Sequence, residues 1–189
     1  MPERTVSGRE WVSRFPGSSS IADLDSSFGA AVASFIAALR TAGARVVVSA
    51  TYRPSERAYL MHWAWKIKHK KVSPAKVPHR AGVDIEWDHQ DDEASIAAAS
   101  AMVDAYGMSS LKIAPALRSR HTERKAIDMT ISWSLKELVI VDAFDAKVKI
   151  ASLPRTGMNA ELHTVGLSYG VIKFLRGAVD KPHWSSDGA

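Results

Sequence analysis

The chain contains no cysteine among its 189 residues. Disulfide bonds and thiolate metal ligands are therefore excluded, and any metal site must use histidine and carboxylate side chains. The N-terminal residues contain no apolar run, so we expect no signal peptide. No stretch approaches the roughly 20 apolar residues of a membrane span. If the target lies outside the cytoplasm, something else must carry the protein there.

The composition is that of an ordinary globular protein, with 46% hydrophobic and 24% charged residues. The formal net charge is +5, and basic residues are densest between Lys66 and Arg80. One interpretation is attraction to a polyanion such as nucleic acid, a cell-wall polymer or a membrane surface. The other interpretation is a solvated helix end and loop, and charge alone does not choose between them.

Hydrophobic periodicity predicts an α+β fold. Residues 1–22 are polar and predict a loosely packed lead-in, followed by a single domain over 23–189. Apolar side chains recur at three- and four-residue intervals in 23–41, which predicts a helix, and the β-branched run 45–50 predicts a buried strand. Further helices are expected over 55–70, 91–106 and 159–166, and further strands over 83–87, 129–133, 138–141 and 148–150. We expect a small, mainly antiparallel sheet with the helices packed on one face.

Two histidine–aspartate pairs suggest a metal site. His121 lies seven residues before Asp128, and Asp180 lies three residues before His183. Two histidines and one aspartate can fill three corners of a zinc tetrahedron and leave the fourth for water. The remaining aspartate would then be free to act on that water. Spacing alone is a weak signal, because Asp128 and Asp180 could equally be turn residues and the histidines structural.

A family resemblance strengthens this interpretation. Ser119, His121, Ala126 and Asp128, followed by Asp180-Lys-Pro-His183-Trp184, resemble the motifs of the zinc peptidases of the D-alanyl-D-alanine carboxypeptidase and L-alanyl-D-glutamate endolysin group. That group shares its fold with lysostaphin-type enzymes and the hedgehog signalling domain. The segment 48–53 also resembles the strand end that presents the family's arginine. The resemblance spans about residues 23–186, with an atypical insertion around 71–91.

The resemblance implies a role for each matching residue. His121, Asp128 and His183 would bind Zn²⁺, Asp180 would be the general base, and Arg53 would stabilise the developing oxyanion. Zinc lowers the pKa of a bound water to about 7, a carboxylate can relay its proton, and a fixed guanidinium stabilises growing negative charge.

The neighbouring residues have less defined roles. Ser119 would brace the site through hydrogen bonds rather than act as a nucleophile. Trp184 is expected to pack beneath His183, with substrate stacking as the alternative. His163 either lines the cleft or packs on its helix. One position departs from the family pattern, because Arg124 stands where the family has glycine, a residue often chosen for a positive φ.

The favoured hypothesis is a zinc metallopeptidase that hydrolyses an amide bond in peptidoglycan stem peptides or cross-links. It would be made in the cytoplasm and act on the cell wall or in the periplasm after lysis or delivery by a secretion machine. The alternative is a non-catalytic cell-wall or protein-binding module on the same fold. A nucleic-acid binder rests only on charge and six tryptophans, with no recognition helix, so we expect no nucleic-acid partner. We expect a monomer and leave open an immunity or delivery partner.

Overall fold

The chain forms two compact units, which are described separately. The computed structural model describes residues 4–176 and 179–189. The helical unit contains the residues up to Gly17 together with Arg53–Ser119, and the sheet unit contains Ser18–Tyr52 together with Arg120–Ala189. Each unit has its own hydrophobic core. The expected division at residue 22, into a lead-in and one domain, does not coincide with these two units.

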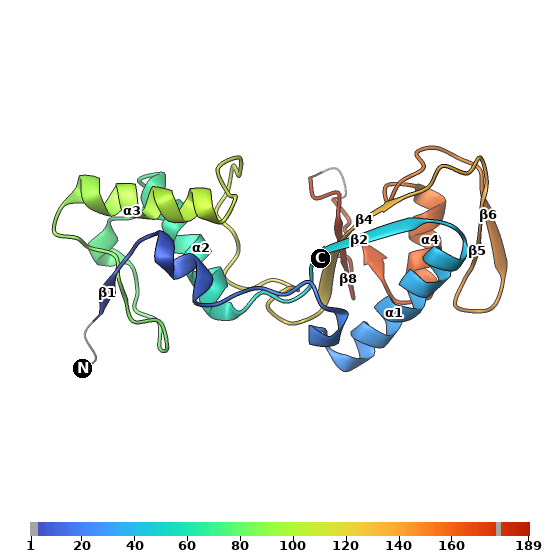
Figure 1. The fold of residues 1–189 in the computed structure, drawn as a ribbon, viewed down its shortest axis with the longest axis horizontal. Helices are drawn as coiled ribbons and strands as arrows, with labels where there is room; N and C mark the ends of the chain where they lie inside the picture. The colour runs from blue at the N-terminus through green and yellow to red at the C-terminus, as the bar shows by residue number, and fades with distance from the viewer. Residues whose placement is uncertain (1–3, 177–178) are drawn as a thin grey trace. The chain divides into compact units, whose positions relative to one another are not determined.

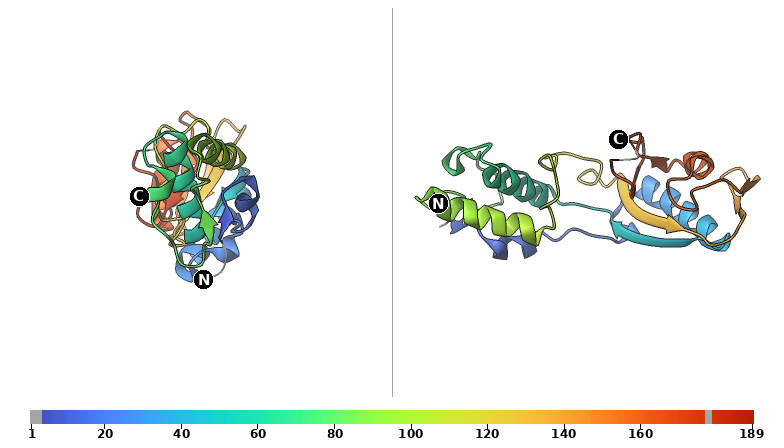
Figure 2. Two further views of the ribbon diagram at one scale, coloured as in Figure 1. Left: turned by 90° about the vertical axis from the view of Figure 1, so that its left-hand side faces the viewer. Right: turned by 90° about the horizontal axis from the view of Figure 1, so that it is seen from above.

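The helical unit is built on two helices, α2 (Ser55–Lys68) and α3 (Asp92–Ala105), which lie side by side in both views (Figures 1 and 2). The carboxylate of Asp91 caps α3 by accepting the backbone N–H of Ala94. The smaller elements are the 3-10 turns η1 (Arg9–Ser13) and η3 (Pro74–Lys76) and the parallel strands β1 (Thr5–Val6) and β3 (Ile85–Glu86). The N-terminal segment is thus part of a folded unit, and Trp11 is only 1% exposed.

The sheet unit is a four-stranded antiparallel sheet with the order β2-β4-β8-β7. Its strands are β2 (Arg45–Ala50), β4 (Ala126–Ser132), β7 (Ile172–Lys173) and β8 (His183–Ser185). The helices of this unit are α1 (Ser26–Thr41) and α4 (Ala160–Ser168). The 3-10 turn η2 (Ile21–Asp23) precedes α1. A separate hairpin pairs β5 (Leu138–Val141) with β6 (Lys147–Ile150).

Side chains of the central strand β4 alternate between the two faces of the sheet. Ile127, Met129 and Ile131 of β4 are buried in a core shared with α1 and α4. Asp128 therefore points to the opposite face, because successive side chains of a strand alternate. The strand places one carboxylate, flanked on both sides by core residues, at a fixed position on that face.

The α+β class and the mainly antiparallel sheet are confirmed. The expectation for the helices needs refinement, because only α1 and α4 share the core of the sheet, whereas α2 and α3 pack in the helical unit. β4 also begins three residues before the predicted start, at Ala126. Within the described part of the chain, no helix combines the length and the apolar character needed to cross a membrane.

The close approach of α4 to the sheet yields a stability prediction. A Cβ added at Gly166 would lie 2.7 Å from the backbone oxygen of Val171 and 2.8 Å from the ring of Trp184. We expect Gly166→Ala to lower the free energy of unfolding by about 1–3 kcal/mol, because the added methyl group overpacks this contact. Urea denaturation followed by tryptophan fluorescence measures the change.

Gly29 in α1 provides the matched control, since the nearest atom to an added Cβ there is 3.4 Å away. Gly29→Ala should leave stability unchanged or raise it by up to about 1 kcal/mol through helix propensity. Equal effects of the two substitutions would contradict the proposed close packing.

Candidate metal centre

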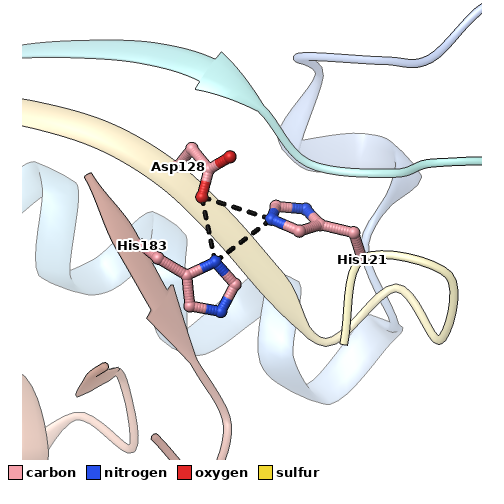
Figure 3. Close-up of side chains that lie close together, drawn as sticks. All are labelled: His121, Asp128 and His183. Atoms are coloured by element: carbon pink, nitrogen blue, oxygen red, sulfur yellow. Dashed lines mark hydrogen bonds and ion pairs between the residues drawn. The ribbon is translucent and has the colours of Figure 1, made fainter. Parts of the chain in front are cut away.

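Three side chains from separate segments of the sheet unit converge on one point (Figure 3). His121 Nε2 lies 3.2 Å from Asp128 Oδ1 and 3.2 Å from His183 Nδ1. The third edge, from His183 Nδ1 to Asp128 Oδ1, measures 3.0 Å. Ligands about 2.0–2.1 Å from a tetrahedral zinc lie roughly 3.3 Å apart, so this triangle is close to the size that zinc requires. The group could hold a metal ion.

The sheet fixes two of the three side chains. Asp128 and His183 are directly opposite each other in the antiparallel pairing of β4 with β8. On the other side of β4, the pairing with β2 is irregular between Val48 and Ala50, and Ser49 Oγ donates to the backbone oxygen of Asp128. Strand irregularities of this kind are frequent beside functional sites, where they redirect a side chain.

His121 comes from the turn that leads into β4. The N–H of Arg124 bonds to the carbonyl of His121, and the N–H of Lys125 bonds to the carbonyl of Arg120. Arg124 has φ 61°, in the left-handed region, so the chain reverses and enters the strand at Ala126. Glycine would adopt this conformation without steric cost, so Arg124 stands at a position that favours glycine.

Two backbone oxygens set the tautomers of the histidines. His121 Nδ1 lies 2.8 Å from the carbonyl oxygen of Thr51, and His183 Nε2 lies 3.1 Å from the backbone oxygen of Ala189. A carbonyl oxygen only accepts, so each of these ring nitrogens must carry a proton. In the neutral imidazoles, the nitrogens that face Asp128 then carry lone pairs. Such outward hydrogen bonds are typical of metal-binding histidines.

The charges within the group depend on one another. Burial tends to raise the pKa of Asp128, but hydrogen bonds from the protonated imidazoles of His121 and His183 outweigh it and hold that pKa well below its usual range. Burial tends to lower the pKa of His183, but its hydrogen bond to Asp128 and the charge of that carboxylate raise it overall. Both histidines are buried, while the Asp128 side chain is 18% exposed, so solvent reaches the group beside the carboxylate.

The residues assigned to the reaction lie outside this triangle. Arg53 and Ser119 belong to the helical unit, whereas the three converging residues belong to the sheet unit. Asp180 is exposed and precedes β8, and its backbone oxygen accepts from the N–H of His183. Its negative charge contributes to the raised pKa of His183. The roles of Asp180, Arg53 and Ser119 stay predictions.

Trp184 and His163 lie on the core side of the sheet. Trp184 has no exposed surface, and its ring centroid is 5.6 Å from that of Phe35, an arrangement that precludes stacking on a substrate. His163 packs edge-on against Trp184 and donates from Nε2 to the carbonyl oxygen of Gly157. Burial lowers the pKa of His163, which favours the neutral imidazole. His163 and Trp184 therefore pack together on the core side of β8.

Two further side chains brace the site and were not anticipated from the sequence. Lys173 of β7 is only 5% exposed, and its ammonium donates to the backbone oxygens of His183 and Asp180. Arg120, beside His121, bonds to both carboxylate oxygens of Asp187, which follows β8. A buried lysine and an arginine next to a histidine have no distinctive sequence signal, because both depend on tertiary neighbours.

No protein-family model, curated protein or solved structure matches this chain. The class that the fold and the site define is therefore an α+β protein with a histidine–aspartate–histidine group able to hold a metal ion.

Arg124 offers a test of the turn that carries His121. Its guanidinium stacks on Tyr52 at 4.0 Å and donates to the backbone oxygen of Asp23 at 3.1 Å. Arg124→Ala and Arg124→Gly both remove these contacts, but only alanine keeps a Cβ at positive φ. We expect the alanine variant to be less stable than the glycine variant by about 1 kcal/mol in urea denaturation. An alanine variant at least as stable as the glycine variant would contradict the strained turn.

Zinc binding should stabilise the protein more strongly at higher pH. Without metal, the pKa of His183 is raised in the folded state, so protonation of His183 stabilises the fold. This contribution is fully present below about pH 6.5 and is lost as pH rises through the folded-state pKa. Metal binding instead requires the unprotonated imidazole, so zinc affinity rises with pH. At a free zinc concentration about 100 times the dissociation constant, binding raises the free energy of unfolding by about 2.7 kcal/mol. This corresponds to a rise in Tm of roughly 5–10 °C.

Differential scanning fluorimetry with and without zinc measures this effect. The zinc-induced shift in Tm should grow between about pH 6 and about pH 8. His183→Ala should remove the shift, while His69→Ala, which changes a histidine of the helical unit, should retain it. A shift that is independent of pH, or one that survives His183→Ala, would contradict this site.

Proposed function

We propose that the protein is a zinc-dependent metallopeptidase that hydrolyses an amide bond in peptidoglycan stem peptides or cross-links. The observation that carries the proposal is the convergence of His121 Nε2, Asp128 Oδ1 and His183 Nδ1 within 3.2 Å of one another. Two nitrogens and one oxygen form a donor set typical of catalytic zinc, which keeps one coordination position open. The order of the motif residues along the chain adds support, because it resembles that of the zinc peptidases of wall peptides.

In this proposal His121, Asp128 and His183 would hold a zinc ion, which would supply Lewis acidity and lower the pKa of water to about 7. Asp180 takes a proton from the attacking water and passes it to the leaving amine. Arg53 stabilises the negative charge that grows on the former carbonyl oxygen. The Thr51 and Ala189 oxygens keep the two imidazoles in the orientation that presents their lone pairs.

The position of Asp180 is compatible with its role. It lies in the turn before β8, three residues from His183. Lys173 holds the backbone oxygen of Asp180 at 3.2 Å, which fixes the turn from the core side while the side chain stays exposed. A carboxylate held near a metal site and open to solvent can exchange protons with water.

The base role predicts a specific loss of activity. Asp180→Asn should lower kcat for the release of new amino groups from purified wall sacculi by about 10²–10⁴-fold, because the amide cannot relay a proton. Zinc content, measured by mass spectrometry of the metal, should stay at the wild-type value. Chelation should abolish the activity of the wild-type protein, and added zinc should restore it.

Asp145→Asn is the matched control, since Asp145 is an exposed carboxylate of the same unit in the turn of the β5–β6 hairpin. It should retain wild-type activity. Full activity of Asp180→Asn would exclude Asp180 as the base. Sedimentation of the wild-type protein with sacculi without release of amino groups would instead favour the alternative, a non-catalytic wall-binding module.

A further inference from the structure

The face of the sheet opposite α1 and α4 carries a row of exposed and half-buried side chains next to the metal ligands. We call this row the open strip, and it consists of Arg45, Val47 and Ser49 of β2 with Thr130 and Ser132 of β4. The intervening residues of both strands contact the core of the sheet unit, so the five residues of the strip share the other face. Val47 is 44% exposed there, although it is apolar.

The open strip is continuous with the metal centre. Asp128 lies on the same face of β4 as Thr130 and Ser132, because side chains of a strand alternate. Ser49 is hydrogen-bonded to the backbone oxygen of Asp128, so the strip begins beside this ligand. Ser132 lies four residues farther along β4, which corresponds to about 13 Å at roughly 3.3 Å per residue.

The far end of the open strip is cationic. Arg45 pairs with Ser132 in the register of β2 and β4, and its side chain is exposed. Among residues 4–176 and 179–189, no acidic side chain forms an ion pair with Arg45, in contrast to Arg120, which is engaged by Asp187 and Glu123. A guanidinium in this situation suits a carboxylate, which it can bind through two parallel hydrogen bonds.

We propose that the open strip is the path of the substrate and that Arg45 binds a carboxylate of an extended, anionic peptide about four residues from the scissile amide. This inference rests on the proposed peptidase function and narrows its substrate class. Hydroxyl groups of Thr130 and Ser132 provide hydrogen bonds along the path, and Val47 provides one apolar contact. A free dipeptide is too short to reach Arg45, so such a substrate would leave this contact unused.

The experiment uses the bond that the wild-type protein cuts in sacculi, identified by mass spectrometry of the fragments. Synthetic peptides that span this bond are made in pairs. One member of each pair carries a single carboxylate, and the other carries the corresponding amide at the same position. This position is varied up to five residues from the bond on either side. We expect KM to be lowest for a carboxylate about four residues from the bond on one side. The KM ratio of amide to carboxylate peptide at that position should be about tenfold.

Arg45→Gln should reduce this ratio to about one, because the amide side chain carries no charge. Arg40→Gln is the matched control, since Arg40 is an exposed arginine in the last turn of α1, on the core side of the sheet. It should keep the tenfold ratio. A ratio near one in the wild-type protein, or a tenfold ratio that survives Arg45→Gln, would overturn the role of Arg45.

A binding measurement separates this inference from the proposed function. Fluorescence anisotropy of labelled carboxylate and amide peptides reports affinity whether or not a bond is cut. If sacculi are not digested, the peptidase proposal fails, and synthetic peptides with the sequence of the intact stem peptides are used for binding. A carboxylate preference that depends on Arg45 then still supports the open strip as an anionic-peptide site, and its absence rejects that site.

Discussion

The candidate site of the sheet unit is defined by the close approach of three atoms that can each donate an electron pair. The carbonyl of Thr51 and the backbone oxygen of Ala189 hold protons on the outer nitrogens of His121 and His183, so the inner nitrogens face Asp128 with lone pairs. The three atoms lie within 3.2 Å of one another. Positive charge at its centre stabilises such an arrangement. A proton supplies that charge at low pH, and a divalent metal ion could supply it at neutral pH.

The surrounding structure holds these three atoms together. Pairing of β4 with β8 places Asp128 opposite His183, and the ion pair between Arg120 and Asp187 joins the segment of His121 to the segment after β8. Lys173 adds a buried cation beneath the strand. The contacts that position the three candidate ligands also contribute to the stability of the fold, so metal binding at this site would be coupled to stability.

The sequence predicted the parts of the structure that depend on local patterns. The apolar stripe of α1 and the β-branched run of β2 gave their positions closely, and the three candidate ligands do converge. The expectation of a buried strand over 45–50 was wrong, because β2 is an edge strand with one exposed face. The anchoring of the N-terminal segment by Trp11 was not predicted, since a single tryptophan in a polar stretch has no periodicity. The carbonyl of Thr51 could not be predicted either, because every residue has one and only tertiary structure selects which is used.

X-ray absorption spectroscopy at the zinc edge tests the central claim most directly. We predict one zinc ion per chain, bound by four nitrogen or oxygen ligands at about 2.0–2.1 Å with the outer-shell scattering of two imidazoles. His183→Ala should lose the zinc or show a single imidazole. A wild-type chain that takes up no zinc, or a His183→Ala variant with an unchanged spectrum, would contradict the account.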